Sequence, residues 1–352
     1  MNNTFWQLLV STILVGGTFS TASLVRAQTP PPGMPTPEMQ AVLDELAALK
    51  GKPIETLTAK EARKQPTPAD AVASLMKKNK IKPEEVGDVD NRSIDGPVKD
   101  IKIRIYSPKG KGPFPIIVYY HGGGFVIANL DVYDATPRAL CNAVGAVVVS
   151  AHYRQGPEDK FPAAHEDALA AYQWVIANAA KIKGDPSRVA VVGESAGGGL
   201  ANYVSMATRD RKLPMPLHQV LVYPVADSDT STPSYMENAN AKPLGKAMMK
   251  WFFENAASPA DATDPRFAPM HADLAGLPPT TVITAQIDPL RSEGEAFAKK
   301  LASAGVKVNY RNFNGVTHEF FGMGAVLSEA REALNLAAND LTSAFATKMP
   351  AN

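Results

Sequence analysis

Cysteine, excess charge and long basic runs are all scarce in this chain of 352 residues. Its single cysteine, Cys141, excludes an internal disulfide framework and a metal site built from several thiolates. Because this residue falls in a helical pattern, we expect a small buried hydrophobic side chain rather than a reactive thiol. The formal net charge is +1, from 36 basic and 35 acidic residues, and this balance predicts no nucleic-acid partner.

A long apolar segment is also missing, because the stretch from Phe5 to Phe19 is too short to span a membrane comfortably. This stretch is typical of a secretory signal peptide, although the first four residues contain no lysine or arginine. Small residues precede Gln28 at the spacing of a cleavage site. We therefore expect residues 1–27 to be removed and the protein to be secreted or periplasmic. An uncleaved N-terminal anchor is the alternative.

The length suits one large α/β domain with an added cap, or two domains, and an apolar share of 45% is ample for a core. Residues 28–37 are a proline-rich leader, which we expect to be extended. Apolar residues at helical spacing follow, so we expect N-terminal cap helices within residues 38–85. The α/β domain then occupies residues 86–352, with a cap insertion at about residues 228–272.

Continuous apolar runs alternate with helical patterns through the α/β domain. Such runs suit parallel strands that helices cover on both faces, so the pattern predicts a mostly parallel, doubly wound α/β sheet. The expected strands are 101–106, 116–120, 146–150, 189–192, 220–223, 281–285 and 306–313, and the expected helices are 135–144, 163–178, 196–208, 291–304 and 326–346.

The segment 188–199 carries the most informative motif, a serine between two glycines that follows a strand and precedes a helix. Gly193 and Gly197 allow a turn that is too tight for side chains on either flank of Ser195. In this strand–turn–helix context the hydroxyl is exposed at the carboxyl end of the strand, where a base can reach it. We therefore predict that Ser195 is a nucleophile rather than part of an ordinary turn.

A serine hydroxyl needs a base within hydrogen-bond reach and an acid that orients the base. Catalytic groups of a parallel sheet lie beyond the carboxyl ends of its strands, and His318 follows the last expected strand. Asp288 follows the strand 281–285 and precedes a helix, where a helix N-cap is the alternative role. The chain order Ser195, Asp288, His318 favours the catalytic roles. The remaining candidates for the acid are Asp227, Asp264 and Asp273.

A tetrahedral intermediate also needs backbone N–H groups that meet its negative oxygen. Three glycines follow the strand 116–120, and glycine lets the backbone approach a ligand closely. We predict the N–H groups of Gly123, Gly124 and Ala196 as the donors of this oxyanion hole. The residues expected to shape the loop without acting as bases are His121, Gly122 and Glu194.

An aromatic cluster lies inside the insertion at about residues 228–272. Packing of a crossover helix and lining of an apolar substrate pocket explain this cluster equally well. The residues that we assign to the pocket are Phe125, Met248, Trp251 and Phe252.

Taken together, the motifs resemble the hormone-sensitive-lipase family of α/β-hydrolases, whose bacterial members are small carboxylesterases. The likeness runs from about Glu38 to the C-terminus. It rests on the segments 121–124, 153–164, 193–198, 223–224 and 288–290, and on His318. The resemblance implies an α/β-hydrolase catalytic domain within residues 86–352, a cap, and hydrolysis of short- to medium-chain esters without a cofactor or metal.

Three departures from the family pattern leave the three catalytic candidates untouched. Glu194 stands where many members have aspartate, and Gln155-Gly156 replaces a more usual Leu-Ala pair. Glu319 follows the histidine where glycine is frequent, and so places an extra carboxylate beside the predicted base.

We therefore expect a serine carboxylesterase that acts on a small-molecule ester through an acyl-enzyme. Amide or N-acetyl hydrolysis with the same residues is one alternative, and a non-catalytic ligand-binding protein on this fold is another. A homodimer is compatible with the sequence.

Overall fold

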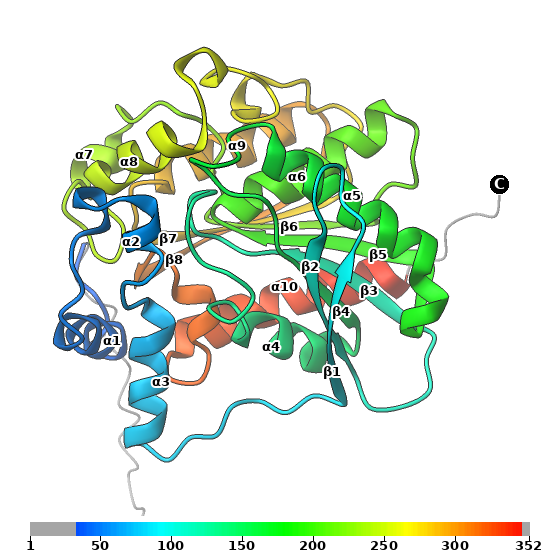
Figure 1. The fold of residues 1–352 in the computed structure, drawn as a ribbon, viewed down its shortest axis with the longest axis horizontal. Helices are drawn as coiled ribbons and strands as arrows, with labels where there is room; N and C mark the ends of the chain where they lie inside the picture. Colours follow the sequence, from blue (N-terminus) through cyan, green and yellow to red (C-terminus); the bar gives the residue numbers. More distant parts are fainter. Residues whose placement is uncertain (1–32, 347–352) are drawn as a thin grey trace, which may run out of the picture.

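A computed structural model describes residues 33–346 and contains one eight-stranded sheet. The strand order is β1-β2-β4-β3-β5-β6-β7-β8, and β2 is antiparallel to both of its neighbours (Figure 1). The remaining neighbours, from β4 to β8, pair in parallel. The strands are β1 (Asp88–Ile94), β2 (Ile101–Ser107), β3 (Phe114–Tyr120), β4 (Val147–Ala151), β5 (Gly184–Glu194), β6 (Gln219–Val222), β7 (Thr280–Ile287) and β8 (Val308–Thr317).

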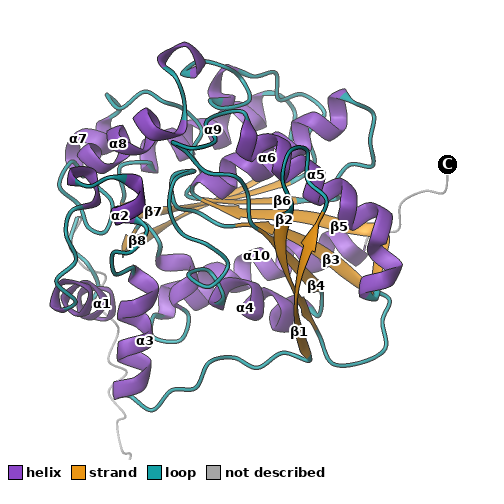
Figure 2. Cartoon of the chain, in the orientation of Figure 1, coloured by secondary structure: helices purple, strands orange, loops and turns teal. Residues whose placement is uncertain are grey.

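Helices cover both faces of this sheet, as the buried strand runs predict (Figure 2). One face carries α5 (Ala163–Asn178), α6 (Ala196–Asp210) and α9 (Arg291–Ser303), and the other carries α4 (Ala135–Val144) and α10 (Ser328–Ala346). Every residue of β4 and of β6 is buried in consequence. The mostly parallel α/β architecture predicted from the sequence is therefore confirmed.

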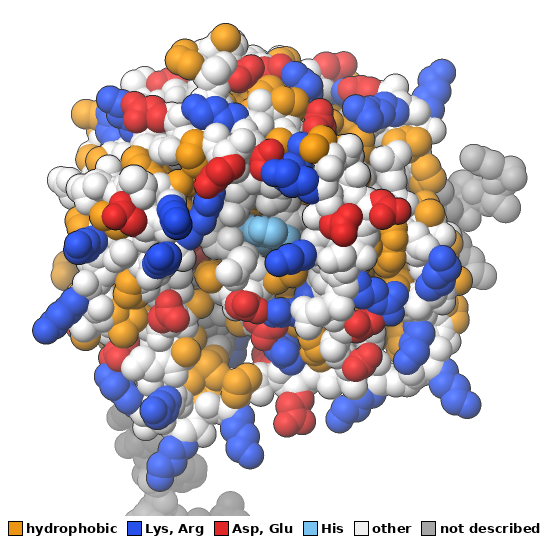
Figure 3. Space-filling model, viewed as in Figure 1, with side chains coloured by type: hydrophobic (Ala, Val, Ile, Leu, Met, Phe, Trp, Pro, Cys, Tyr) orange, Lys and Arg blue, Asp and Glu red, His pale blue; other side chains and the backbone are white. Residues whose placement is uncertain are grey.

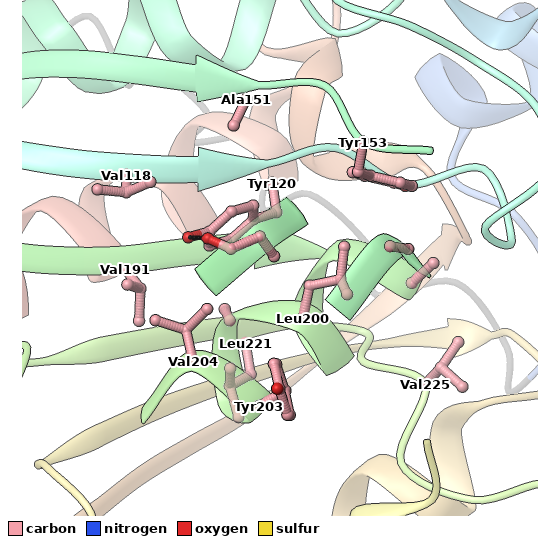
Figure 4. Close-up of a cluster of buried hydrophobic side chains, with 14 of the residues drawn as sticks. Val118, Tyr120, Ala151, Tyr153, Val191, Leu200, Tyr203, Val204, Leu221 and Val225 are labelled. Atoms are coloured by element: carbon pink, nitrogen blue, oxygen red, sulfur yellow. Dashed lines mark hydrogen bonds between the residues drawn. The ribbon is translucent and has the colours of Figure 1, made fainter. Parts of the chain in front are cut away.

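Successive residues of a strand point to opposite faces, so the sheet divides the core into two clusters. On one face Val118 and Tyr120 of β3 pack with Leu200 of α6 (Figure 4). On the other face Ile117 and Tyr119 of the same strand pack with residues of α4 and α10. This alternation matters for the site, because it places the hydroxyl of Tyr119 within hydrogen-bond distance of Glu194, the last residue of β5.

The N-terminal segment forms the short helices α1 (Pro37–Ala48), η1 (Ile54–Thr56), α2 (Ala59–Ala62) and α3 (Pro68–Lys78) before the sheet begins. Figure 1 shows these helices at one end of the molecule, on the side where α7 (Pro233–Glu237) and α8 (Lys246–Ala256) lie. Both α7 and α8 belong to the insertion between β6 and β7, which also contains η3 (Pro259–Asp261) and η4 (Pro269–His271). The predicted cap segments thus lie outside the sheet.

The last strand differs from the prediction, because β8 continues to Thr317 instead of ending at Phe313. A register irregularity in β7 between Ala285 and Ile287 lets Ile287 pair with Thr317. Gly315 tolerates the positive φ of +69° that this irregular stretch requires. His318 therefore follows the strand directly, and does not lie on the longer loop that we expected.

The predicted signal peptide lies outside the described residues, as does most of the proline-rich leader. Within residues 33–346, no helix combines the length and the apolar character that a membrane span requires. Cys141 is fully buried in α4, and burial raises the pKa of its thiol to about 12. This thiol is therefore a packed hydrophobic group, as its helical position predicts.

Candidate active site

Ser195 occupies the sharp turn between the end of β5 and the start of α6, with φ +55° and ψ −119°. A Cβ atom on Gly193 would lie 1.9 Å from the carbonyl oxygen of Gly197. A Cβ atom on Gly197 would in turn lie 2.0 Å from the carbonyl oxygen of Tyr120. Both flanking positions therefore exclude any side chain, and this is the physical reason for the two glycines of the motif.

Asp288 and His318 meet because they follow neighbouring parallel strands, β7 and β8. The imidazole Nδ1–H of His318 donates to Oδ2 of Asp288 over 2.6 Å. The other carboxylate oxygen accepts the backbone N–H of Leu290 at 2.8 Å. Both side chains are buried, so the pair is shielded from water and its geometry leaves Nε2 of the histidine for another partner.

The end of β6 links Ser195 to His318. The backbone N–H of Ser195 donates to Val222 at 2.9 Å, and the N–H of Val225 donates to the carbonyl of Ser195 at 3.1 Å. Between these two contacts, the ring of Tyr223 packs with its centroid 4.4 Å from that of His318. Among the hydrogen bonds of residues 33–346, none joins the serine hydroxyl to the imidazole. Such contacts often tighten only when substrate binds.

Opposing influences set the protonation of His318. Burial disfavours its charged form, which would lower the pKa. The Asp288 carboxylate and its hydrogen bond outweigh this effect and raise the pKa of His318, with help from Glu319 and Glu194. The histidine can therefore accept a proton readily, as a general base must.

The glycine loop after β3 has the conformation expected for an oxyanion-binding loop. Gly123 and Gly124 have φ values of +103° and +59°, which favour glycine. The Gly123 carbonyl accepts the N–H groups of Val126 and Ile127, which fixes the turn. In the described part of the chain, no hydrogen bond uses the N–H of Gly123, Gly124 or Ala196. These three donors are free to meet a negatively charged oxygen.

His121 contacts this loop through a hydrogen bond and stacks on a neighbouring tyrosine. Its Nδ1–H donates to the Gly122 carbonyl at 2.7 Å, and its Nε2 accepts from Nδ1 of His152 at 2.9 Å. Its ring stacks on Tyr153 with centroids 4.5 Å apart. Burial, and then the neighbouring His152, lower the pKa of His121 to about 3. A neutral, hydrogen-bonded imidazole is suited to shaping the loop, as predicted, and not to acting as a base.

His152, which sequence reasoning did not single out, lies at the edge of a cavity of about 910 Å³ beside β2. Figure 3 shows a histidine in a hollow of this face, among basic and acidic side chains. Most of the lysine and arginine side chains along this cavity form ion pairs, including Arg63 with Glu158 and Arg154 with Asp167. The charges largely cancel within the cavity wall.

Glu194 holds two tyrosines beneath Ser195. Tyr119 donates to Oε1 at 2.5 Å, and Tyr223 donates to Oε2. Burial raises the pKa of Glu194 to about 7, although the two hydrogen bonds oppose this rise. The sequence indicated a loop-shaping role for Glu194 but not its partners. Alternation along β3 places Tyr119 on the correct face, whereas Tyr223 lies beyond the end of β6.

Glu319 is half-buried directly after His318, and both of its carboxylate oxygens accept from the hydroxyl of Tyr133, at 2.6 and 2.7 Å. Burial raises the pKa of Glu319, and His318 and Tyr133 oppose this rise. The hydroxyl of Tyr133 lies only 2.3 Å from the position of a Cβ atom on Gly122. The absence of a side chain at Gly122 therefore makes room for this tyrosine.

The four residues assigned to the substrate pocket occupy different environments. Phe252 of α8 presses on the glycine loop, because a Cβ atom on Gly124 would lie 2.2 Å from its ring. Trp251 donates its indole N–H to the carbonyl of Leu57 at 3.2 Å, which ties α8 to the N-terminal segment. Met248 is partly buried on the same helix. Phe125 packs inside a buried aromatic cluster that includes His165 and Phe267.

The alternative acids have other partners. Asp227 lies 3.4 Å from the imidazole of His271, and Asp264 pairs with Arg266. Asp273 accepts the backbone N–H of Ala275. Of the aspartates considered, Asp288 alone contacts His318 among the residues that the structure describes. No group of three or more potential ligands in residues 33–346 could hold a metal ion.

Comparison with known proteins agrees with this geometry. A family model described as alpha/beta hydrolase fold matches residues 117–322, more than half of the chain. The chain belongs to the hormone-sensitive-lipase-like family of α/β-hydrolases. The family and fold predicted from the sequence are thereby confirmed.

Relatives and solved structures extend this similarity over most of the chain. The carboxylesterase NlhH of Mycobacterium tuberculosis is 39% identical over 253 residues, which cover 70% of this chain and 79% of its own. An ethyl acetate hydrolase of Pseudomonas putida is 34% identical and covers 84% of this chain and 93% of its own. The crystal structure of an esterase from Pyrobaculum calidifontis is 38% identical, with a TM-score of 0.80 over 88% of this chain and 98% of its own.

Proposed function

We propose that the protein is a carboxylic ester hydrolase that works through an acyl-enzyme. The observation that carries this proposal is the buried Asp288–His318 pair, which adjoins a serine held on a strained turn. Three backbone N–H groups that have no hydrogen-bond partner within residues 33–346 lie on the loop and helix start beside that serine. The relatives named carboxylesterase and ethyl acetate hydrolase support the same reaction class.

In the first half of this reaction, the Ser195 oxygen attacks the ester carbonyl carbon while His318 takes the hydroxyl proton. Asp288 holds the imidazole in the tautomer that presents Nε2, and stabilises the imidazolium that forms. The carbonyl oxygen becomes negative and accepts hydrogen bonds from the N–H groups of Gly123, Gly124 and Ala196. His318 then returns the proton to the departing alcohol, which leaves the acyl group on the serine.

In the second half, a water molecule replaces the alcohol. His318 removes a proton from this water, which attacks the acyl carbonyl and again produces an oxyanion on the same three donors. The intermediate collapses, Ser195 regains its proton, and the carboxylic acid leaves. All of the groups required belong to the chain and to the solvent.

We further propose short- to medium-chain esters as substrates, because Phe252 and α8 close over the glycine loop and limit the space above it. Purified protein should release p-nitrophenol from acetyl to octanoyl p-nitrophenyl esters, with lower rates for longer chains. Ser195→Ala should lower kcat by at least about four orders of magnitude, since removal of a nucleophile has effects of this size.

Anilides with the same acyl groups complete this test. Turnover of anilides with no turnover of esters would replace ester hydrolysis with amide hydrolysis. Ligand binding without turnover of either series would contradict the proposal. Activity that rises towards long chains would contradict the substrate range.

We also propose that the protein is exported after cleavage before Gln28, and that a homodimer is one form it can adopt. The apolar stretch from Phe5 to Phe19 supports export. N-terminal sequencing of the exported protein should begin at or near Gln28, and an intact Met1 would contradict cleavage. Light scattering coupled to size-exclusion chromatography measures the mass in solution, and a monomer mass at all concentrations would contradict the dimer.

A further inference from the structure

The hydroxyl of Tyr133 contacts two parts of the candidate active site that are far apart in the sequence. Both carboxylate oxygens of Glu319, which follows His318 directly, accept from this hydroxyl at 2.6 and 2.7 Å. A Cβ atom built on Gly122 would lie 2.3 Å from the same hydroxyl oxygen and 3.2 Å from the carbonyl oxygen of Glu194. Tyr133 therefore connects the residue after the proposed base with the first glycine of the glycine loop, beside the turn that carries the nucleophile.

Tyr133 itself has little freedom to move. Its side chain is buried, with 6% of its surface exposed, and α4 begins two residues after it. The side chain of Asn129 accepts the backbone N–H groups of Asp131 and Val132, at 2.9 and 3.1 Å, which fixes the turn before the tyrosine. The ring of Tyr133 lies 5.7 Å from that of His121, centroid to centroid. A side chain held in this way can fix the distance between the groups that it contacts.

The backbone of Glu319 provides a second, independent observation. Its φ is +72°, in the left-handed region that is unfavourable for residues other than glycine. Residues in such conformations persist where surrounding contacts hold them, and they cluster at active sites. Within residues 33–346, the hydroxyl of Tyr133 supplies the only hydrogen bonds to the side chain of Glu319. Glycine would relieve the backbone at this position, but it would remove the acceptor for Tyr133.

We propose that Tyr133 and Glu319 are positioning residues for ester hydrolysis, and that their hydrogen bonds fix the glycine loop relative to His318. The loop N–H groups and the imidazole act on the same tetrahedral intermediate, the first on its negative oxygen and the second on the protons of the nucleophile and the leaving alcohol. The spacing between them therefore affects the rate, and an error of about 1 Å can cost about a hundredfold. This inference rests on the proposed function, and it adds two residues outside the groups that touch the substrate.

Glu319→Gly is the most direct test, because it removes the carboxylate and also relieves the left-handed backbone. The variant should unfold at the same urea concentration as wild type or at a higher one. Its kcat for p-nitrophenyl acetate, measured on the plateau of the pH profile, should fall about tenfold with KM nearly unchanged, since the spacing matters in the transition state. A stable variant with the kcat of wild type would overturn the proposal.

Tyr133→Phe removes the other half of the contact and should lower kcat by a similar factor. The double variant with Glu319→Gly should be no slower than the slower single variant, because both changes break the same hydrogen bonds. Tyr172→Phe is the matched control, since this tyrosine of α5 loses a hydrogen bond of 3.0 Å to the carbonyl of Pro214 and should keep the kcat of wild type. Multiplied losses in the double variant would overturn the proposal.

Glu319→Gln separates the hydrogen bond from the charge. Its amide oxygen can still accept from Tyr133, so kcat should stay within about threefold of wild type. The charged groups that raise the pKa of His318 are Asp288, Glu319 and Glu194, of which Asp288 has the largest effect. Loss of the Glu319 charge should therefore move the acid limb of the kcat/KM profile to lower pH. A fall in kcat as large as that of Glu319→Gly would overturn the proposal, because the charge would then be what matters.

Hydrogen–deuterium exchange tests the positioning role without a substrate. Peptides that contain residues 121–124 should exchange severalfold faster in Tyr133→Phe and in Glu319→Gly than in wild type, but not in Tyr172→Phe. Faster exchange in both variants, together with a wild-type protein that hydrolyses no ester, would contradict the proposed function and support the contact between loop and histidine. Unchanged exchange in both variants would overturn the positioning role, even where the wild type hydrolyses esters.

Discussion

At the scale of single residues, Glu194 shows how the site combines function with a cost in stability. Its carboxylate holds Tyr119 and Tyr223 beneath the nucleophile turn, yet it is 1% exposed. Burial raises its pKa from 4.5 to about 7. The folded protein therefore binds a proton at Glu194 that the unfolded chain releases between these two values.

The sign of this effect predicts the behaviour of Glu194→Gln. A group whose pKa is raised on folding stabilises the protein fully below pH 4.5, and this contribution is lost as the pH rises through 7. Glutamine cannot ionise, so the variant should gain on the order of 3 kcal/mol of unfolding free energy relative to wild type between pH 4.5 and pH 8. Urea denaturation at both pH values measures this difference. An equal difference in unfolding free energy between the variant and wild type at pH 4.5 and at pH 8 would contradict the raised pKa of Glu194.

At the scale of elements, helix α8 connects the insertion to the glycine loop. Phe252 occupies the space above Gly124, and Trp251 contacts the N-terminal segment through Leu57. The contact with Gly124 is so close that the loop position depends on the helix. Activity should therefore respond to changes in α8, although this helix contributes none of the proposed catalytic groups.

Gly124→Ala tests this dependence. Its Cβ would meet the ring of Phe252 at 2.2 Å, so the loop must shift and kcat/KM should fall about a hundredfold. Phe252→Ala in the same chain makes room, and the double variant should recover much of this loss. A double-mutant cycle with ester hydrolysis as the readout measures the coupling between the two positions.

Gly145→Ala is the matched control for backbone strain. Gly145 also has a positive φ, +65°, but no atom lies within 4 Å of a Cβ built there. This substitution should cost about 1 kcal/mol of stability and leave kcat/KM unchanged. Independent effects of Gly124→Ala and Phe252→Ala would show that α8 does not position the loop.

At the scale of the whole molecule, four buried or half-buried histidines make folding sensitive to acid. Burial is the largest cause of the lowered pKa of each of these four side chains. The values are about 3 for His121 and His165, and about 4 for His152 and His218. The unfolded chain binds protons at about pH 6.5 that the folded protein excludes, so this part of the stability falls as the pH drops below 6.5.

His165 allows the loss of stability at low pH to be measured without the loss of a hydrogen bond. Neither of its ring nitrogens has a hydrogen-bond partner among the described residues. His165→Phe should leave stability nearly unchanged at pH 7.5 and raise it by about 2 kcal/mol at pH 5, since phenylalanine cannot bind a proton. Urea denaturation at the two pH values gives both numbers.

His218→Phe is the comparison for His165→Phe. The imidazole of His218 shares a hydrogen bond of 2.8 Å with Thr281, so this variant should also lose stability at pH 7.5. An equal effect of His165→Phe at both pH values would contradict the acid-sensitivity argument.

Local patterns in the sequence were sufficient for the architecture and for much of the candidate site. Strands buried on both faces require continuous apolar runs, and the turn around Ser195 requires glycine where the backbone leaves no room for Cβ. Parallel strands then place Asp288 and His318 at one edge of the sheet. These features depend on steric fit and burial over a few neighbouring residues, so the local sequence is enough to predict them.

Only the tertiary structure decided which distant side chains share hydrogen bonds and space. The tyrosines that bind Glu194, the single donor of Glu319 and the ring above Gly124 come from segments far apart in the chain. The extended end of β8 depends on an irregularity in β7, a different strand. Side-chain type limits what each group can bind, but proximity depends on the packing of every layer, and no local pattern encodes it.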